Sequence, residues 1–404
     1  MKKISYTFIV SGLIILILFI FLVTWTIQYF FQPITIPTGS ATFGSQTVPA
    51  EVVKVVDQTQ VDATTGSKPY QTLSVKVLQG EYKDIPFQVD YGKHEAYPSN
   101  FHFVPGDKVY IIINKMPNNQ IDAYYVDYVR SKPMAILLGA FILSILIMGR
   151  WKGLGSLISL GFSMVVIINY MIPHILSGEN PIKVSLIGSI ILLGVTLYLT
   201  YGWNLKTHAS VMSMMLSLLL TGMLSLLFVY LTRLTGYGDE NTMFLMQTSQ
   251  TQIDPRGLLL AGMIIGALGV LDDLVTSQSA AVVEIYDANP ALGFRRTFQK
   301  AMHIGEDHVA ATVNTLVLAY TGASLPLLLM FTLGNGSYSY LINSEFLAEE
   351  IVRTLVGSLG LIAAVPISTF IATVLIVNQD RLGVWGAFLG SEAGDGESEH
   401  GHAH

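Results

Sequence analysis

Uninterrupted apolar runs recur along the chain, and they constrain its fold more than any other feature. A bilayer core of roughly 30 Å needs about 20 helical residues to cross it. Of the 404 residues, 51% are hydrophobic and only 12% are charged, whereas a soluble domain usually carries about 25% charged residues. We therefore expect an α-helical polytopic membrane protein with about eight transmembrane helices.

The expected spans form one N-terminal anchor and a group of seven helices further along. Lys2 and Lys3 precede the first apolar run, at residues 8–31. This run exceeds the roughly 7–15 residues of a signal-peptide core, so we expect it to be retained as an anchor. The other spans are expected at residues 133–148, 153–172, 184–201, 210–231, 257–275, 309–331 and 355–377.

A different pattern occupies residues 32–130. Apolar and polar residues alternate there in short runs, at residues 50–56, 71–77, 87–91, 108–114 and 123–129. Alternation with a period of two, bounded by Gly, Pro and Asn, is typical of β-strands. The segment therefore predicts a small extracytoplasmic all-β domain, barrel-like and of the OB or SH3-like type.

The chain is thus expected to have four parts. They are an N-terminal anchor (1–31), a β-domain (32–130), a seven-helix transmembrane domain (131–378) and a C-terminal tail (379–404). The tail mixes Gly, Glu and Asp with His400, His402 and His404. Because it can bury nothing, we expect it to be disordered.

Basic residues at the ends of the spans predict the orientation, because cytoplasmic loops are enriched in Lys and Arg. Lys2, Lys3, Arg150, Lys152 and Lys206 fall on one side of the membrane. This bias predicts a plasma-membrane protein with both termini in the cytoplasm and the β-domain outside. The formal net charge of −6 suggests no nucleic-acid surface, and the absence of cysteine excludes disulfides and thiolate metal sites.

Two adjacent carboxylates, Asp272 and Asp273, lie inside one of the apolar spans. Small residues precede them at helical spacing, so that one helix face carries Gly262, Gly266, Gly269, Asp273 and Ser277. Such a face lets another helix approach closely in lipid, so we expect Asp273 on a buried seam. Carboxylates at bilayer depth cost roughly 2–3 kcal/mol and are functional by default. The alternative is a helix that ends near Leu271 and leaves both side chains in cytoplasmic water.

The next span begins with a second polar cluster around His308. Because this helix is expected to enter from the cytoplasm, and the two aspartates lie in the cytoplasmic half of their span, His308 and Asn314 reach roughly the same depth as the aspartates. The sequence therefore predicts an intramembrane polar site shared by two helices. Its members are Asp272, Asp273, Thr276, Ser277, Gln278, His308, Thr312, Asn314 and Thr315.

The donor set of this site suits a divalent cation or a proton relay. Carboxylates with one imidazole match Mg²⁺, Mn²⁺ or Zn²⁺, so Asp272, Asp273 and His308 are candidate metal ligands. A histidine at this depth is also common as an ordinary interfacial side chain, and that alternative stays open.

A third polar group, Glu349, Glu350 and Arg353, opens the last span. Glu349 and Arg353 are four residues apart in the favourable order for a helical ion pair. We expect a structural ion pair near the outer membrane surface.

The expected spans carry a series of short motifs. They are Gly266-Ala267-Leu268-Gly269-Val270-Leu271-Asp272-Asp273, Ser277-Gln278-Ser279, Asp307-His308-Val309, Asn314-Thr315-Leu316 and Gly357-Ser358-Leu359-Gly360-Leu361 with Pro366. In these motifs the chain resembles the YibE/F-like family of bacterial multi-pass membrane proteins. The resemblance extends over about residues 132–377 and implies the multi-pass architecture, without implying a particular activity.

Three functions remain open on this sequence. The favoured one is a transporter or channel for an ion or small polar solute, which would use the buried carboxylates. The second is a membrane sensor or assembly platform whose β-domain binds a partner subunit or a second copy of the chain. The third is an intramembrane metal-dependent hydrolase with Glu284 or Glu306 as base. An HExxH pair is absent from the sequence, so an enzyme is the less favoured class.

Overall fold

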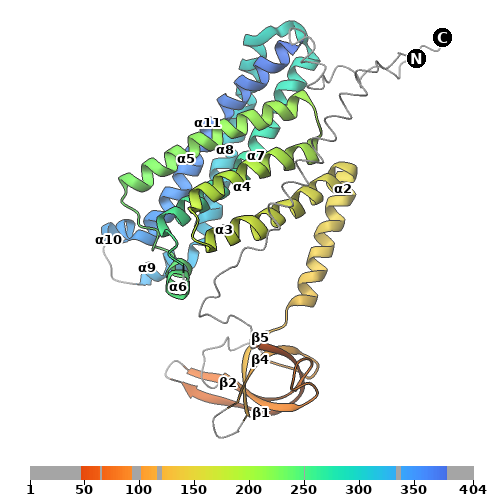
Figure 1. The fold of residues 1–404 in the computed structure, drawn as a ribbon, viewed down its shortest axis with the longest axis vertical. Helices are drawn as coiled ribbons and strands as arrows, with labels where there is room; N and C mark the ends of the chain where they lie inside the picture. The colour runs from red at the N-terminus through yellow and green to blue at the C-terminus, as the bar shows by residue number, and fades with distance from the viewer. Residues whose placement is uncertain are drawn as a thin grey trace, which may run out of the picture. The chain divides into compact units, whose positions relative to one another are not determined.

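The computed structural model describes residues 47–63, 66–92, 102–115, 121–249, 251–333 and 338–379. The anchor expected at residues 1–31 and the tail beyond residue 379 lie outside this part of the chain. The described residues form two compact units, and the boundary between them along the chain falls between Ser144 and Ile145. The first unit is mainly a β-sheet, and the second is a bundle of helices (Figure 1).

The sheet has five antiparallel strands in the order β3-β2-β1-β4-β5. Their bounds are β1 (Thr47–Ala63), β2 (Gly66–Val77), β3 (Pro86–Tyr91), β4 (Lys108–Lys115) and β5 (Ile121–Tyr128). The expectation of five strands in this segment is confirmed, whereas β1, with 17 residues, and β2, with 12, are longer than expected. β1 pairs with both β2 and β4, and register shifts between Val52 and Lys54 and between Val55 and Asp57 bend it.

This bending brings the two edges of the sheet together into a nearly closed barrel. Tyr91 of β3 and Tyr125 of β5 make an edge-on ring contact, with their centroids 5.2 Å apart. Phe103, in the segment before β4, packs edge-on against Tyr91 with ring centroids 4.9 Å apart. The inward-facing residues of the strands, among them Val52, Leu73 and Ile111, form one buried apolar core.

A buried glutamine fixes the segment between β3 and β4 to the barrel core. Gln71 of β2 is only 2% exposed. Its Oε1 accepts a hydrogen bond from the backbone N–H of Phe103 at 2.8 Å, and its Nε2 donates to the carbonyl of Phe103 at 3.4 Å. One side chain thus satisfies both backbone polar groups of a buried residue.

Replacing Gln71 with leucine should loosen this segment. Gln71→Leu leaves the buried N–H and C=O of Phe103 without partners, at a cost of about 1–3 kcal/mol for each group. Amide hydrogen exchange of the full chain should show faster exchange in peptides around Phe103. Gln88→Leu, on an exposed position of β3, is the control and should leave exchange unchanged; equal exchange in both variants would contradict this role.

The second unit is built from long helices joined by short turns. In chain order the helical elements are α2 (Ser131–Val166), η1 (Ile167–Met171), α3 (Ile172–Leu176), α4 (Pro181–Tyr201), α5 (Leu205–Leu231), α6 (Glu240–Thr248), α7 (Pro255–Ala288), η2 (Pro290–Leu292), α8 (Gly293–Ala323), α9 (Leu325–Leu333), α10 (Tyr338–Asn343) and α11 (Glu345–Val377). α2 breaks at Arg150, whose φ of 47° and ψ of −124° are not helical.

Six helices in the described part of the chain are long and apolar enough to cross a membrane. They are Ser131–Arg150, Lys152–Leu176, Pro181–Tyr201, Leu205–Leu231, Pro255–Ala288 and Glu345–Val377. Each coincides with an expected span. The total of about eight is not reached among the described residues, since the anchor lies outside them and the span expected at 309–331 is interrupted.

That interruption falls at Ser324, between α8 and α9. The apolar part of α8, from residue 309 to its end at Ala323, would extend about 22 Å at 1.5 Å per residue, less than a bilayer core of roughly 30 Å. Its first turns carry charged residues such as Arg295, Arg296 and Glu306. α8 therefore differs from the six spans in both composition and continuity.

α5, α7 and α11 pack against one another and form the centre of the bundle, with α4 beside α7 and α8 beside both α7 and α11 (Figure 1). The largest apolar core lies between them and includes Leu271, Leu274 and Leu361. Close helix contact depends on Gly360 of α11, because a Cβ there would lie 2.1 Å from Oγ1 of Thr221 on α5.

Candidate functional site

Both aspartates of the candidate site lie near the middle of α7. The helix begins after Asp254, whose side chain caps it by accepting a hydrogen bond from the N–H of Arg256. It then continues for 34 residues to Ala288. Asp272 is about 26 Å from the first residue at 1.5 Å per residue. The helix does not end near Leu271, contrary to that part of the alternative.

The two aspartates have different surroundings. Asp273 is exposed and Asp272 is half-buried, which reverses the expectation that Asp273 lies on the buried seam. α7 turns its bulky residues toward α4, α5 and α11, among them Leu268, Leu271 and Val275. Its glycine face is left outside this packing, and a Cβ at Gly262 or Gly269 would meet nothing within 4 Å. Large apolar side chains bury more surface than glycines do, which explains the preference.

Asp272 borders a cavity of about 240 Å³ between α7, the second half of α2 and α4. We call it the hydroxyl cavity. It is lined by Ser156, Ser159, Leu160, Ser163, Thr196, Leu197, Thr200, Tyr201 and Asp272. Oδ1 of Asp272 is fully buried and has no hydrogen-bond partner among the described residues. Burying a charged carboxylate without a partner is costly, so the charge of Asp272 needs a compensating group.

Hydrogen bonds hold the hydroxyl groups of this cavity in place. Oγ of Ser159 on α2 lies 2.9 Å from Oγ1 of Thr200 on α4 and donates to the carbonyl of Thr196 at 3.2 Å. Ser163 donates to the carbonyl of Ser159 at 2.9 Å, and Thr196 donates to that of Leu192 at 2.7 Å. The protons of Ser159, Ser163 and Thr196 are therefore directed at backbone carbonyls.

The cavity residues of α2 and α4 were not among the site residues predicted from the sequence. Ser156, Ser159 and Ser163 are spaced by three and four residues, and Thr196 and Thr200 by four, so each set lies on one helix face. This pattern of hydroxyl groups inside apolar spans was the available signal. It was overlooked because serine and threonine are common in membrane helices and carry no charge.

The polar residues of α8 approach α7 through a single side-chain pair in the described chain. Nδ1 of His308 lies 3.4 Å from Oγ of Ser277. Thr312 donates to the carbonyl of His308, and Thr315 to that of Ala311. Asn314 and Thr315 are exposed. The expected grouping of both aspartates with His308, Thr312, Asn314 and Thr315 is therefore reduced to the Ser277–His308 contact.

The candidate metal ligands do not form a binding group. No cluster of three or more His, Asp or Glu side chains suited to a metal ion occurs among the described residues. Asp272 faces α2 and α4, whereas His308 faces Ser277. The set Asp272, Asp273 and His308 is thus divided between different sides of α7, and the residues present do not fit a bound divalent ion.

Thr276 and Gln278 have structural roles. Oγ1 of Thr276 donates to the carbonyl of Asp272 at 2.7 Å, within α7 itself. Gln278 is 1% exposed, and its Nε2 donates to the carbonyl of Ala301 on α8 at 2.8 Å and to Oγ1 of Thr369 on α11 at 2.7 Å. One amide therefore joins three helices.

The acidic residues at the start of α11 require a correction. Arg353 pairs with Glu350 at 2.6 Å, three residues away, rather than with Glu349. Glu349 is 3% exposed, and its Oε1 accepts a hydrogen bond from the N–H of Gly238 at 3.0 Å. Its neighbour Glu345 accepts from the N–H of Gly236 at 3.1 Å. Glu349 thus holds the turn after α5, which leaves Glu350 for the arginine.

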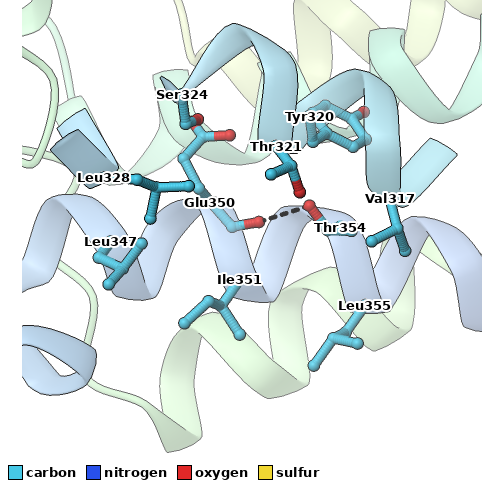
Figure 2. Close-up of a pocket in the computed structure, with 10 residues that line it drawn as sticks. All are labelled: Val317, Tyr320, Thr321, Ser324, Leu328, Leu347, Glu350, Ile351, Thr354 and Leu355. Carbon is cyan, nitrogen blue, oxygen red and sulfur yellow. Dashed lines mark hydrogen bonds between the residues drawn. The ribbon is translucent and has the colours of Figure 1, made fainter. Parts of the chain in front are cut away.

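A second cavity, of about 350 Å³, lies between α8, α9 and α11. Figure 2 shows Tyr320, Thr321 and Ser324 facing Glu350 across it, with leucine, isoleucine and valine side chains around them. Thr354 donates a hydrogen bond to the backbone carbonyl of Glu350 at 2.7 Å. Because Glu350 is already paired with Arg353, this cavity holds no uncompensated carboxylate.

The apolar spans and the cavity between them define a helical membrane protein with a barrel-like domain. A model of the YibE/F-like protein family matches residues 137–378, more than half of the 404 residues. The chain therefore belongs to the YibE/F-like family, and the resemblance inferred from its motifs is confirmed. Comparisons with curated proteins and with solved structures found no match.

Removing the amide of Gln278 should destabilise the helical bundle. Gln278→Leu removes the hydrogen bonds to the carbonyl of Ala301 and to Oγ1 of Thr369, each worth about 0.5–1.5 kcal/mol. We expect a lower thermal unfolding midpoint in detergent. Gln299→Leu, at an exposed position of α8, should leave the midpoint unchanged. If both variants unfold at the wild-type temperature, the joining role of Gln278 is wrong.

Proposed function

We propose that this protein is a transporter or channel for an ion or small polar solute. The observation that carries the proposal is the carboxylate residue Asp272 in the lining of the hydroxyl cavity, where the described chain supplies no lysine, arginine or histidine to pair with it. Polar cavities between membrane helices are the usual location of substrate and ion sites in transporters. The site residues of this proposal are Asp272 with Ser159, Ser163, Thr196 and Thr200.

A charged carboxylate within a membrane-crossing helix is energetically costly. Asp272 lies near the midpoint of α7, and α7 is one of the helices suited to cross the membrane. A carboxylate there costs on the order of 2–3 kcal/mol even when hydration and local rearrangement relieve it. Asp272 has no arginine or lysine beside it in the cavity lining that the structure describes. A ligand that compensates its charge during transport is therefore the simplest reason for its position.

The arrangement of the lining suggests an entrance. Ser156 lies near the start of the span Lys152–Leu176, and Tyr201 is the last residue of α4; both are exposed. Ser163 and Thr196 lie further along their helices. The cavity would thus extend from one membrane face inward to Asp272. Arg150, Lys152 and Lys206 flank this face, so the positive-inside rule makes it the cytoplasmic one.

The same rule supports a plasma-membrane location with the β-domain outside and both termini in the cytoplasm. Arg150 and Lys152 follow the first of the six spans, and the β-domain precedes it. A single crossing between the two would therefore put the barrel on the outer side.

A transport assay on reconstituted protein tests the proposal. Proteoliposomes are mixed rapidly with a concentrated solution of sodium chloride, potassium chloride, urea or glycerol. Light scattering follows their osmotic shrinking and the swelling that occurs as the solute enters. We expect faster permeation of at least one of these solutes than in protein-free liposomes. Asp272→Asn should reduce the protein-dependent part of the permeation rate by at least about tenfold, which corresponds to about 1.4 kcal/mol.

Asp273→Asn is the matched control for this assay, because Asp273 is adjacent in sequence but lies outside the cavity lining. It should retain permeation within about twofold of the wild type, as expected for a surface substitution. Permeation equal to that of empty liposomes for every solute would overturn the transport proposal. Equal losses in both variants would remove Asp272 from the site.

A second candidate, a sensor or assembly platform, has one observation in its favour. The barrel is a compact unit with its own apolar core, as expected for an independent binding module. Its strand order, with β3 meeting β5, favours the OB type over the SH3-like type, and OB barrels serve as binding domains. The hydrolase alternative has no assembled metal-ligand group in the described chain.

A further inference from the structure

We infer that the hydroxyl cavity is a binding site for one partly hydrated alkali-metal cation, with Asp272 as its counter-ion. This inference rests on the proposed transport function and specifies the ligand of the same site. It follows from the charge of the lining, the direction of its hydroxyl groups, the number of carboxylates and the size of the cavity.

The charge of the lining selects a cation. Asp272 brings a carboxylate, and the other lining residues in the described chain are serine, threonine, tyrosine and leucine. Lysine, arginine and histidine are absent from this lining, so an anion would meet a negative charge and no positive one. Asp272 is half-buried and lines the cavity, and its buried Oδ1 has no donor of its own among the described residues, so its charge has no partner within the protein.

The hydroxyl groups present oxygen lone pairs. A hydroxyl group has one proton and two acceptor lone pairs. The proton of Ser163 goes to the carbonyl of Ser159, and that of Thr196 goes to the carbonyl of Leu192. Their remaining capacity is as acceptors, which is what a metal cation requires. Ser159 and Thr200 share one hydrogen bond at 2.9 Å, so they add further acceptor oxygens.

The number of carboxylates selects a monovalent ion. Calcium sites collect six to eight oxygens, commonly with several carboxylates, and magnesium demands near-ideal octahedral geometry. The cavity has a single carboxylate, with Asp273 exposed and outside the lining. One negative charge in a medium of low polarity is neutralised by one monovalent cation, whereas a divalent ion would leave a net charge buried.

The size of the cavity indicates that the cation keeps part of its water. A volume of about 240 Å³ corresponds to about eight water molecules at roughly 30 Å³ each. An ion held mainly through water and hydroxyl groups is selected by charge more than by radius. We therefore expect sodium and potassium to bind with similar affinities and a larger organic cation such as choline to be excluded.

Thermal unfolding of the purified full chain in detergent tests this inference without a transport step. A ligand that binds the folded state raises the unfolding midpoint by mass action. We expect sodium and potassium chloride to raise it with the logarithm of their concentration above the dissociation constant, by roughly 5 °C at a hundred times that constant. Choline chloride at equal ionic strength and magnesium chloride should give no such rise.

Two sets of variants locate the effect. Asp272→Asn should abolish the cation-dependent rise, whatever its own midpoint, whereas Asp273→Asn should retain it. Thr196→Val removes a cavity oxygen and should weaken apparent sodium affinity about tenfold, the effect of about 1.4 kcal/mol. Thr315→Val is its control, because Thr315 also donates to the carbonyl four residues earlier but is exposed on α8. If Asp272→Asn does not fold, the comparison of Thr196→Val with Thr315→Val still tests the cation site.

The outcomes separate this inference from the proposed function. A wild-type protein whose midpoint does not respond to sodium or potassium would overturn the cation site, even if solutes permeate the proteoliposomes. A response to magnesium alone, an undiminished response in Asp272→Asn, or an unchanged apparent sodium affinity in Thr196→Val would also overturn it. A concentration-dependent sodium response with no permeation would support the site while rejecting transport.

Discussion

In a bilayer, the partners of a buried polar group must come from the protein itself, and this constraint organises the helical unit. Gln278 meets it by donating to Ala301 and Thr369, which ties α7 to α8 and α11. Glu349 meets it by accepting from the turn at Gly238. Once these groups are satisfied, α7 has a fixed rotation. That rotation points the side chain of Asp272 toward α2 and α4 and leaves Asp273 outside the packed helices.

In the barrel unit a glutamine also pairs with buried polar groups. Gln71 satisfies the N–H and C=O of Phe103 inside an apolar core, as Gln278 does for groups on neighbouring helices. Asp272 is the carboxylate among the buried side-chain atoms without a partner in the described chain; the others are hydroxyl groups, an imidazole nitrogen and a guanidinium nitrogen. An unpaired carboxylate carries a larger desolvation cost than an unpaired hydroxyl group, which favours a functional role for Asp272.

Periodicity in the sequence was enough to predict the strands of the barrel and six of the membrane spans, because both signals are local. The orientation of Asp273 was predicted wrongly, since glycines at Gly262 and Gly269 were taken as a packing face. Which face a helix buries depends on what its neighbours offer, and here Leu271 and Val275 filled the core instead. The serines of α2 and the threonines of α4 could have been noticed. Their meeting with Asp272 is a tertiary contact that periodicity does not encode.

The length of α7 has a mechanical consequence. The helix continues for 16 residues after Asp272 as far as Ala288, which is about 24 Å of rigid rod at 1.5 Å per residue. A tilt of about 5° at the cavity would displace the far end by about 2 Å. Because Gln278 ties this half of α7 to α8 and α11, such a tilt would move the neighbouring helices together with the turn that leads to α8.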